Sequence, residues 1–154
     1  MYRIFEIDDM KYIKGLSGEF VVQEKYDGMR IQIHKKGSDV KIFSFNKKDI
    51  TKKCKKQVDE MKKRHFGDCT LDAELVGFKG EEDVHRADVV SPIFKKEVPE
   101  LELRAHVFDI MYHENKVVAE EPLRERINIL FYQYSQHSSE NLAFPSKKDT
   151  RIAD

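Results

Sequence analysis

Residues 25–30 read Lys25-Tyr26-Asp27-Gly28-Met29-Arg30, and this stretch lies between two runs of β-type sequence. Phe-Val-Val at 20–22 leads into it, and after Gly28 apolar and polar residues alternate as far as His34, which is the period of a half-buried strand. Asp-Gly is typical of a turn. The stretch therefore predicts two strands, with a lysine, a carboxylate and an arginine close together at their junction.

The rest of the chain predicts a mixture of strands and helices. Further strands are expected at 40–45, 70–76, 103–112, 116–118 and 142–144. One helix is expected to start at Asp49 or Thr51 and end at Gly67, and another follows Pro122. The apolar side of the first helix is predicted to hold Ile50, Cys54, Val58, Met61 and His65.

This order favours an α+β fold of antiparallel sheets with flanking helices, because strands and helices do not alternate regularly. Residues 77–93 are expected to form an irregular connection, since they contain Gly80, an acidic cluster and Ser91-Pro92. Strict alternation in 103–112 predicts two faces. One would carry Leu103, Ala105, Val107 and Asp109, and the other Arg104, His106, Phe108 and Ile110.

Composition indicates one soluble globular domain with a buried core. The chain has 154 residues, of which 40% are hydrophobic and 36% charged. It contains no apolar run long enough to span a bilayer and no signal peptide, so no membrane partner and a cytoplasmic location, or a nuclear one in a eukaryote, are expected. The two cysteines are expected to be reduced thiols.

Charge is unevenly distributed although the formal net charge is zero. Residues 47–64 contain nine lysines or arginines and three acidic residues. This segment is a candidate basic patch for nucleic acid, and a solvated helix face explains it equally well.

Lys25 is a candidate nucleophile, since a lysine whose pKa is lowered by desolvation or a nearby cation can act in covalent catalysis. Attack on the α-phosphorus of a nucleotide also requires a cation for the phosphates, a carboxylate for a divalent metal and a surface for the base. Arg30, Glu74 and Phe108 are candidates for these three tasks. Each also has a structural explanation: an exposed strand arginine, a polar strand position and a core aromatic.

Four motifs in this order resemble the nucleotidyltransferase (adenylation) domain of ATP-dependent DNA ligases of the archaeal and eukaryotic type. They are residues 25–30, Phe-Ser-Phe-Asn at 43–46, Leu-Asp-Ala-Glu-Leu at 71–75 and Val-Phe-Asp-Ile-Met-Tyr at 107–112. Glu-Pro-Leu-Arg-Glu-Arg at 121–126 follows the family's next helix. The resemblance runs from about residue 19 to residue 154, and it implies an ATP-grasp-like fold.

The resemblance also implies a reaction and a role for each site residue. Lys25 would be adenylated by ATP with Mg²⁺, and the AMP would pass to the 5′-phosphate of nicked double-stranded DNA before the nick is sealed. Arg30 would bind ribose or phosphate, and Glu74 would place Mg²⁺ and the ribose. Phe108 would stack on adenine, and Gln23 would contact the adenine edge.

Two departures from the family pattern modify this expectation. Phe45 stands where the family usually has an arginine, and Lys47 and Lys48 are the available substitutes for its charge. The later lysine motifs and the oligonucleotide-binding domain are not found in residues 1–154. We therefore expect a single, C-terminally incomplete adenylation domain that does not seal nicks alone.

Three alternatives remain open at this stage. Two are enzymes, an RNA ligase and a capping-type guanylyltransferase. The third is a non-catalytic split subunit that needs a second chain to supply the missing half.

Overall fold

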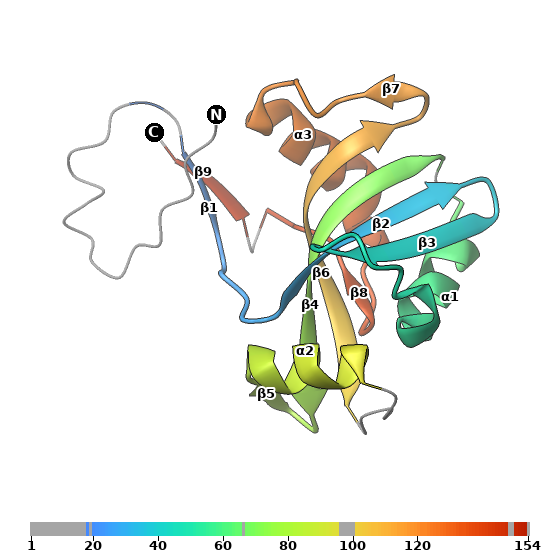
Figure 1. Cartoon of the computed structure of the whole chain (residues 1–154). Helices are drawn as coiled ribbons and strands as arrows, with labels where there is room; N and C mark the ends of the chain where they lie inside the picture. The colour runs from blue at the N-terminus through green and yellow to red at the C-terminus, as the bar shows by residue number, and fades with distance from the viewer. Residues whose placement is uncertain (1–17, 19, 66, 96–100, 148–149, 154) are drawn as a thin grey trace.

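The computed structural model describes residues 18, 20–65, 67–95, 101–147 and 150–153, which contain two sheets (Figure 1). The small sheet pairs β1 (Phe20–Gln23) with β9 (Thr150–Ala153). The large sheet has the order β3 (Asp39–Ser44), β2 (Met29–Lys36), β4 (Cys69–Lys79), β6 (Glu102–His113) and β7 (Lys116–Val117). β5 (Glu82–Val84) pairs with β4, and β8 (Leu142–Ala143) pairs with β6. Every pairing except β6 with β8 is antiparallel, which confirms the expected α+β class.

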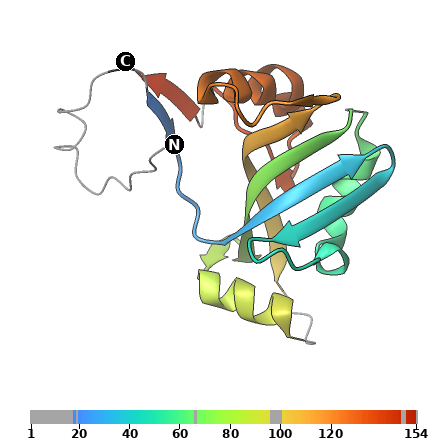
Figure 2. The same cartoon turned by 45° about the horizontal axis from the view of Figure 1, so that its top comes forward.

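The helices lie around the large sheet (Figure 2). The 3₁₀ turn η2 (Thr51–Lys53) and α1 (Lys55–Lys63) pack beside the β2–β3 hairpin, and α2 (Arg86–Phe94) packs against β4 and β2. α3 (Leu123–Ile129) lies against β6 and continues into the π-helical turn η3 (Leu130–Tyr134) and the 3₁₀ turn η4 (Ser135–His137).

One face of the large sheet forms the core with α1 and α3. Alternate residues of β2, β3, β4 and β6 are fully buried there, among them Ile31, Ile33, Ile42, Leu71, Leu75 and Ala105. α1 adds Val58 and Met61 to the same cluster. Gln57 is buried as well, and its side-chain amide donates to the backbone oxygens of Leu103 (2.6 Å) and Asn141 (3.1 Å). This satisfied polar group fixes α1 to β6.

The faces predicted for β6 are wrong at Asp109 and Ile110. Ala73 pairs with Val107, but Asp72 pairs with Asp109, so Phe108 is an extra residue in a β-bulge. Past the bulge the alternation is inverted. Ile110 therefore lies on the core side, where it is fully buried, and Asp109 lies on the opposite side.

The prediction of an irregular connection at 77–93 is also wrong. β4 extends to Lys79, turns back through β5 and is followed by α2, which includes Pro92. Val89 and Ile93 are four residues apart and both buried in the core, and their burial outweighs the backbone hydrogen bond lost at a proline near the helix end.

The helix predicted after Asp49 begins later and ends earlier than expected. The Asp49 side chain accepts from the Thr51 backbone N–H (2.9 Å) and starts η2, whereas α1 begins at Lys55 and ends at Lys63. His65 is consequently exposed and is not part of the apolar side.

Both cysteines are free and buried, and burial raises the pKa of each thiol to about 12. Among the described residues no helix has the length and apolar character required to cross a membrane.

Candidate active site

Lys25 lies on the exposed loop that joins β1 to β2. The loop lies directly against β4 at Gly28, where an added Cβ would stand 2.3 Å from the Leu75 backbone oxygen. Real Cβ atoms do not approach a backbone atom so closely, so only glycine permits this contact. The Gly28 N–H in turn hydrogen-bonds to the Glu74 carboxylate. The turn glycine therefore places the lysine loop beside Glu74.

The two residues between Lys25 and Gly28 anchor the loop on opposite sides. The Tyr26 ring stacks on His106 of β6, with centroids 3.7 Å apart and an interplanar angle of 20°. The Asp27 carboxylate accepts from the backbone N–H of Arg86 (3.3 Å), the first residue of α2. Asp27 thus acts as a cap for a helix that has no side-chain cap of its own.

The site residues of the sheet form a row across three strands. Arg30 of β2 is opposite Glu74 of β4, which is opposite His106 of β6. Directly paired residues of antiparallel strands project from the same face, so these three side chains share the face opposite the core. The Arg30 guanidinium carbon is 5.9 Å from the centroid of the Phe108 ring.

Glu74 is half-buried, and desolvation raises the pKa of its carboxyl above the ordinary value of 4.5. The Gly28 N–H and the charges of Arg86, Lys25 and Arg30 oppose that shift. The carboxylate is therefore surrounded by cationic groups from three different elements.

Asp72 is a site residue that the sequence interpretation missed. It is 1% exposed and forms an ion pair with Arg30, at 2.5 Å between Oδ2 and a guanidinium nitrogen. Its other oxygen, Oδ1, is buried and has no hydrogen-bond partner in the part of the chain that the structure describes. A signal was present, because Asp72 and Glu74 are two apart on one strand and so share a face.

Four of the five predicted site residues converge. Lys25, Arg30, Glu74 and Phe108 are connected by the contacts above, whereas Gln23 belongs to the small sheet. The Gln23 amide donates to the Thr150 hydroxyl of β9 (3.4 Å). The catalytic and binding roles of all five remain predictions.

A groove of about 530 Å³ continues along the same face toward the β2–β3 turn. Its charged lining consists of three lysines and two carboxylates, and it also has aromatic rings: Lys35, Lys36, Lys41, Asp39, Asp68, Phe43 and Tyr112. His34 lies among them, and burial lowers its pKa, an effect that the Asp72 charge partly opposes. The charge of the groove is therefore mixed with a small excess of lysines, and its aromatic rings offer flat surfaces for stacking.

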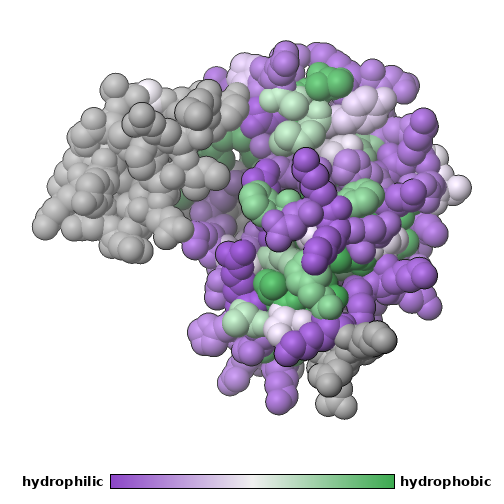
Figure 3. Space-filling model, viewed as in Figure 1, coloured by the Kyte–Doolittle hydropathy of each residue, from purple (hydrophilic) through white to green (hydrophobic). Residues whose placement is uncertain are grey.

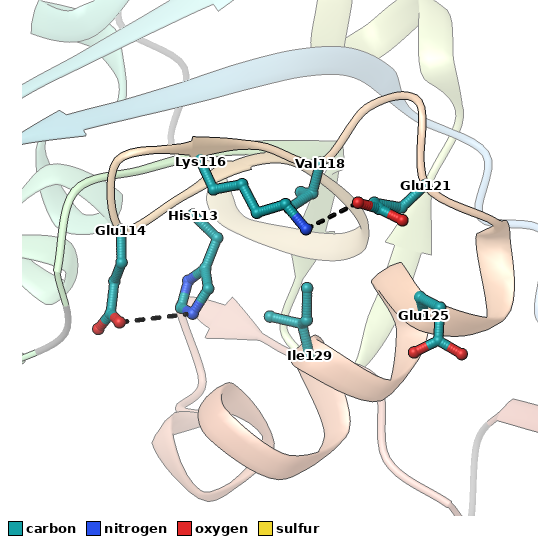
Figure 4. Close-up of a pocket in the computed structure, with 7 residues that line it drawn as sticks. All are labelled: His113, Glu114, Lys116, Val118, Glu121, Glu125 and Ile129. Atoms are coloured by element: carbon teal, nitrogen blue, oxygen red, sulfur yellow. Dashed lines mark hydrogen bonds and ion pairs between the residues drawn. The ribbon is translucent and has the colours of Figure 1, made fainter.

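A second pocket, of about 320 Å³, lies between the β6–β7 hairpin and α3 (Figure 4). Glu114, Glu121 and Glu125 line it, and Lys116 pairs with Glu121 at 2.7 Å. Its carboxylates disfavour phosphate, whereas Arg30 on the other face, beside Glu74, offers a guanidinium to an anion.

The fold and the lysine loop define a class, the nucleotidyltransferase adenylation domains. Two solved structures share this fold. "Mycobacterial DNA ligase D complexed with ATP and MES" matches with a TM-score of 0.60 and 12% identity over 81% of this chain and 39% of that one. The ligase domain of LigD from M. tuberculosis matches with a TM-score of 0.59 and 13% identity, again over 81% and 39%.

Sequence comparison gives the family. Residues 6–153 match the family described as "ATP dependent DNA ligase domain", and the chain belongs to that family. A DNA ligase of Methanococcus aeolicus is 34% identical over 114 residues, which are 70% of this chain and 20% of that protein. A DNA ligase of Archaeoglobus fulgidus is 33% identical over 114 residues, with 71% and 20% covered. The chain thus spans about a fifth of the length of these relatives.

Proposed function

We propose that this chain carries out the first step of ATP-dependent DNA ligation, the transfer of AMP from ATP to Lys25. The observation that carries the proposal is the convergence of the Lys25 loop with Arg30, Glu74 and Phe108 on one open face of the sheet. Membership of the ATP-dependent DNA ligase family supports the choice of nucleotide and reaction.

In this reaction the neutral amine of Lys25 attacks the α-phosphorus of ATP. A nitrogen–phosphorus bond forms as the bond from the α-phosphorus to the bridging oxygen breaks, and pyrophosphate leaves. Lys25 is exposed, so its proton can pass to water. Tyr26 and Asp27 hold the loop on both sides, which limits the number of positions that the amine samples.

Arg30 and Phe108 are the proposed contacts for the rest of the nucleotide. The Arg30 side chain is 48% exposed, and its Asp72 partner engages only one of its nitrogens in the pair, so other N–H groups remain for ribose or phosphate. Phe108 is half-buried beside it and supplies a face for adenine. Gln23 is proposed for the adenine edge, because its amide both donates and accepts.

Mg²⁺ would neutralise charge on the triphosphate as pyrophosphate departs. The described residues contain no cluster of three or more metal-binding side chains. A single carboxylate on this face is still compatible with Mg²⁺, because this ion is often held by one or two carboxylates together with substrate phosphates. Glu74 is the carboxylate that we assign to it.

We further propose that nicked double-stranded DNA receives the AMP at its 5′-phosphate. The surfaces that support this assignment are the lysines that follow β3 and the groove beside the site, in which lysines outnumber carboxylates. Binding through them should weaken steeply with salt, because each lysine–phosphate contact releases a counterion.

Intact-mass spectrometry after incubation with ATP and Mg²⁺ tests the proposal. We expect an added mass of one AMP on the wild-type chain and none on Lys25→Ala or Lys25→Arg. Lys79→Ala is the matched control, since Lys79 is an exposed lysine at the end of β4, and it should be labelled like the wild type. A folded wild-type chain without an adduct would contradict the proposal, and labelling by GTP in place of ATP would indicate a capping-type enzyme.

A further inference from the structure

Phe45 is an exposed aromatic residue at the edge of the candidate site. Its relative exposure is 70%, and it follows directly after β3. Its backbone N–H donates to the Arg30 oxygen (3.1 Å), which extends the β2–β3 pairing by one step. Phe45 is therefore directly opposite Arg30, and its side chain projects from the face that carries Arg30 and Glu74.

The backbone on the far side of Phe45 is fixed by a tight turn. The Ser44 N–H donates to the Lys48 oxygen (2.9 Å), and the Lys47 N–H donates to the Ser44 oxygen (2.8 Å). The Ser44 hydroxyl also accepts from the Lys48 N–H (3.2 Å), and Lys47 has a φ of 60°. An exposed ring on so constrained a backbone loses little entropy when a ligand covers it.

The segment of chain that directly follows Phe45 is strongly basic. Between 47 and 56 the chain has one acidic residue, Asp49, and six lysines: Lys47, Lys48, Lys52, Lys53, Lys55 and Lys56. The Lys48 ammonium lies 5.0 Å from the ring centroid of Phe94, a second partly exposed aromatic at the end of α2. Figure 3 shows apolar surface over α2 and the neighbouring strand ends, enclosed by hydrophilic side chains.

We propose that Phe45 stacks on an unpaired nucleobase at the strand break while the adjacent lysines hold the flanking phosphates. This inference rests on the proposed function, because it takes nucleic acid as the substrate. A single exposed phenylalanine is unremarkable, but one that lies opposite a site arginine, on a fixed turn and directly before a lysine-rich segment, matches the combination used to bind unpaired strands.

Phe45 should also affect which strand breaks the protein prefers. A phenylalanine cannot pair with phosphate, so the contact that the family's usual arginine would make is replaced by one with a base. Breaks whose terminal base is unpaired or mismatched should therefore bind better than breaks with fully paired ends, because their bases need not be unstacked first.

Fluorescence of 2-aminopurine tests this, with the full chain titrated against a nicked duplex that carries the probe at the nick, either paired or opposite a mismatch. The probe leaves the base stack of the duplex when it stacks on Phe45, so its fluorescence should change on binding, and the mismatched duplex should bind more tightly. Phe45→Ala should bind the mismatched duplex about tenfold more weakly. Phe45→Trp should retain binding and a fluorescence change, and Phe45→Leu should not. Tyr132→Ala is the matched control, since Tyr132 is also 70% exposed but lies on η3, and its binding should equal the wild type.

Phe45→Arg provides an opposite prediction. It should lose the preference for the mismatched duplex. The slope of the logarithm of the binding constant against the logarithm of the salt concentration should become steeper by about one unit, because one more counterion is released. Wild-type affinity in Phe45→Ala or Phe45→Leu, or no binding by the wild type, would overturn the inference. The Lys25 adduct is a separate readout: an adduct with no stacking would overturn this inference alone, and stacking with no adduct would overturn the proposed adenylation alone.

Discussion

Arg30 and Asp72 form an ion pair between β2 and β4 in which the two partners have very different environments. The Asp72 side chain is 2% exposed and that of Arg30 is 48% exposed. Both side chains lie on the face of the sheet opposite the core, and the pair runs from a buried point on that face to an exposed one. Arg30 and Asp72 are diagonal neighbours, two residues out of register, since Arg30 is directly opposite Glu74 and Asp72 is opposite Gln32.

Removing Arg30 should destabilise the fold more than neutralising Asp72. Arg30→Gln leaves a buried carboxylate without its cation, and we expect a cost toward the lower end of about 3–5 kcal/mol because water reaches the arginine. Asp72→Asn removes the buried charge and should cost less. Urea unfolding of both single variants and the double variant measures the coupling. A double variant whose cost equals the sum of the two would show that the pair contributes no interaction energy.

Gly28→Ala should displace the lysine loop. The new Cβ would meet a backbone oxygen that cannot turn away, so we expect a loss of about 1–3 kcal/mol in the free energy of unfolding, together with slower adenylation of Lys25. Gly67→Ala is the matched control, since its Cβ would meet only the flexible side chain of Glu114 at 2.8 Å. Adenylation of Gly28→Ala at the wild-type rate would show that the close approach to Leu75 does not position Lys25.

Local patterns predicted the strands on either side of Lys25, because alternation of apolar residues is a property of each strand by itself. They did not predict the bulge at Phe108, since an extra residue in a ladder is defined by the partner strand. The same limit applies to the Arg30–Asp72 pair, which depends on the register of β2 against β4. α2 was missed for another reason: Pro92 is a local signal against helix, and burial of Val89 and Ile93 overrides it.

Glu74→Gln should stabilise the protein at neutral pH. Desolvation raises the pKa of the Glu74 carboxyl in the folded state. A carboxyl whose pKa is raised by folding adds to the free energy of unfolding at pH values below its pKa in the unfolded chain. That contribution is lost as the pH rises through its pKa in the folded protein. The variant and the wild type should thus be similar below about pH 4.5 and diverge above it. The gain should be a few tenths of a kcal/mol, since half of the side chain remains in water.

Glu60 offers the opposite case for the same pH series. A hydrogen bond from Arg64 lowers the pKa of Glu60. Glu60 therefore adds to the free energy of unfolding at pH values above the usual pKa of a carboxyl group, and this contribution is lost in acid. Glu60→Gln should therefore be less stable than the wild type at pH 7. Unfolding curves from pH 3 to pH 8 that move in the same direction for both variants would contradict the assigned cause at Glu74.

Arg126→Ala should be among the most destabilising single changes at a charged residue. Arg126 is 3% exposed and makes two hydrogen bonds to the Asp109 carboxylate, at 2.7 and 2.9 Å, and one to the Glu121 backbone oxygen. Asp109 follows the bulged Phe108, so the pair ties α3 to the part of β6 that presents the proposed adenine platform. We expect a cost of about 3–5 kcal/mol, because a carboxylate is left without its partner. Lys116→Ala is the control at an exposed pair and should cost less than about 1 kcal/mol.

Arg126→Lys keeps the positive charge but loses the two-pronged guanidinium contact to Asp109. It should restore part of the stability, and it should raise the KM for ATP because the neighbouring Phe108 is held less firmly. An unchanged KM in a folded Arg126→Lys variant would limit the role of this pair to stability.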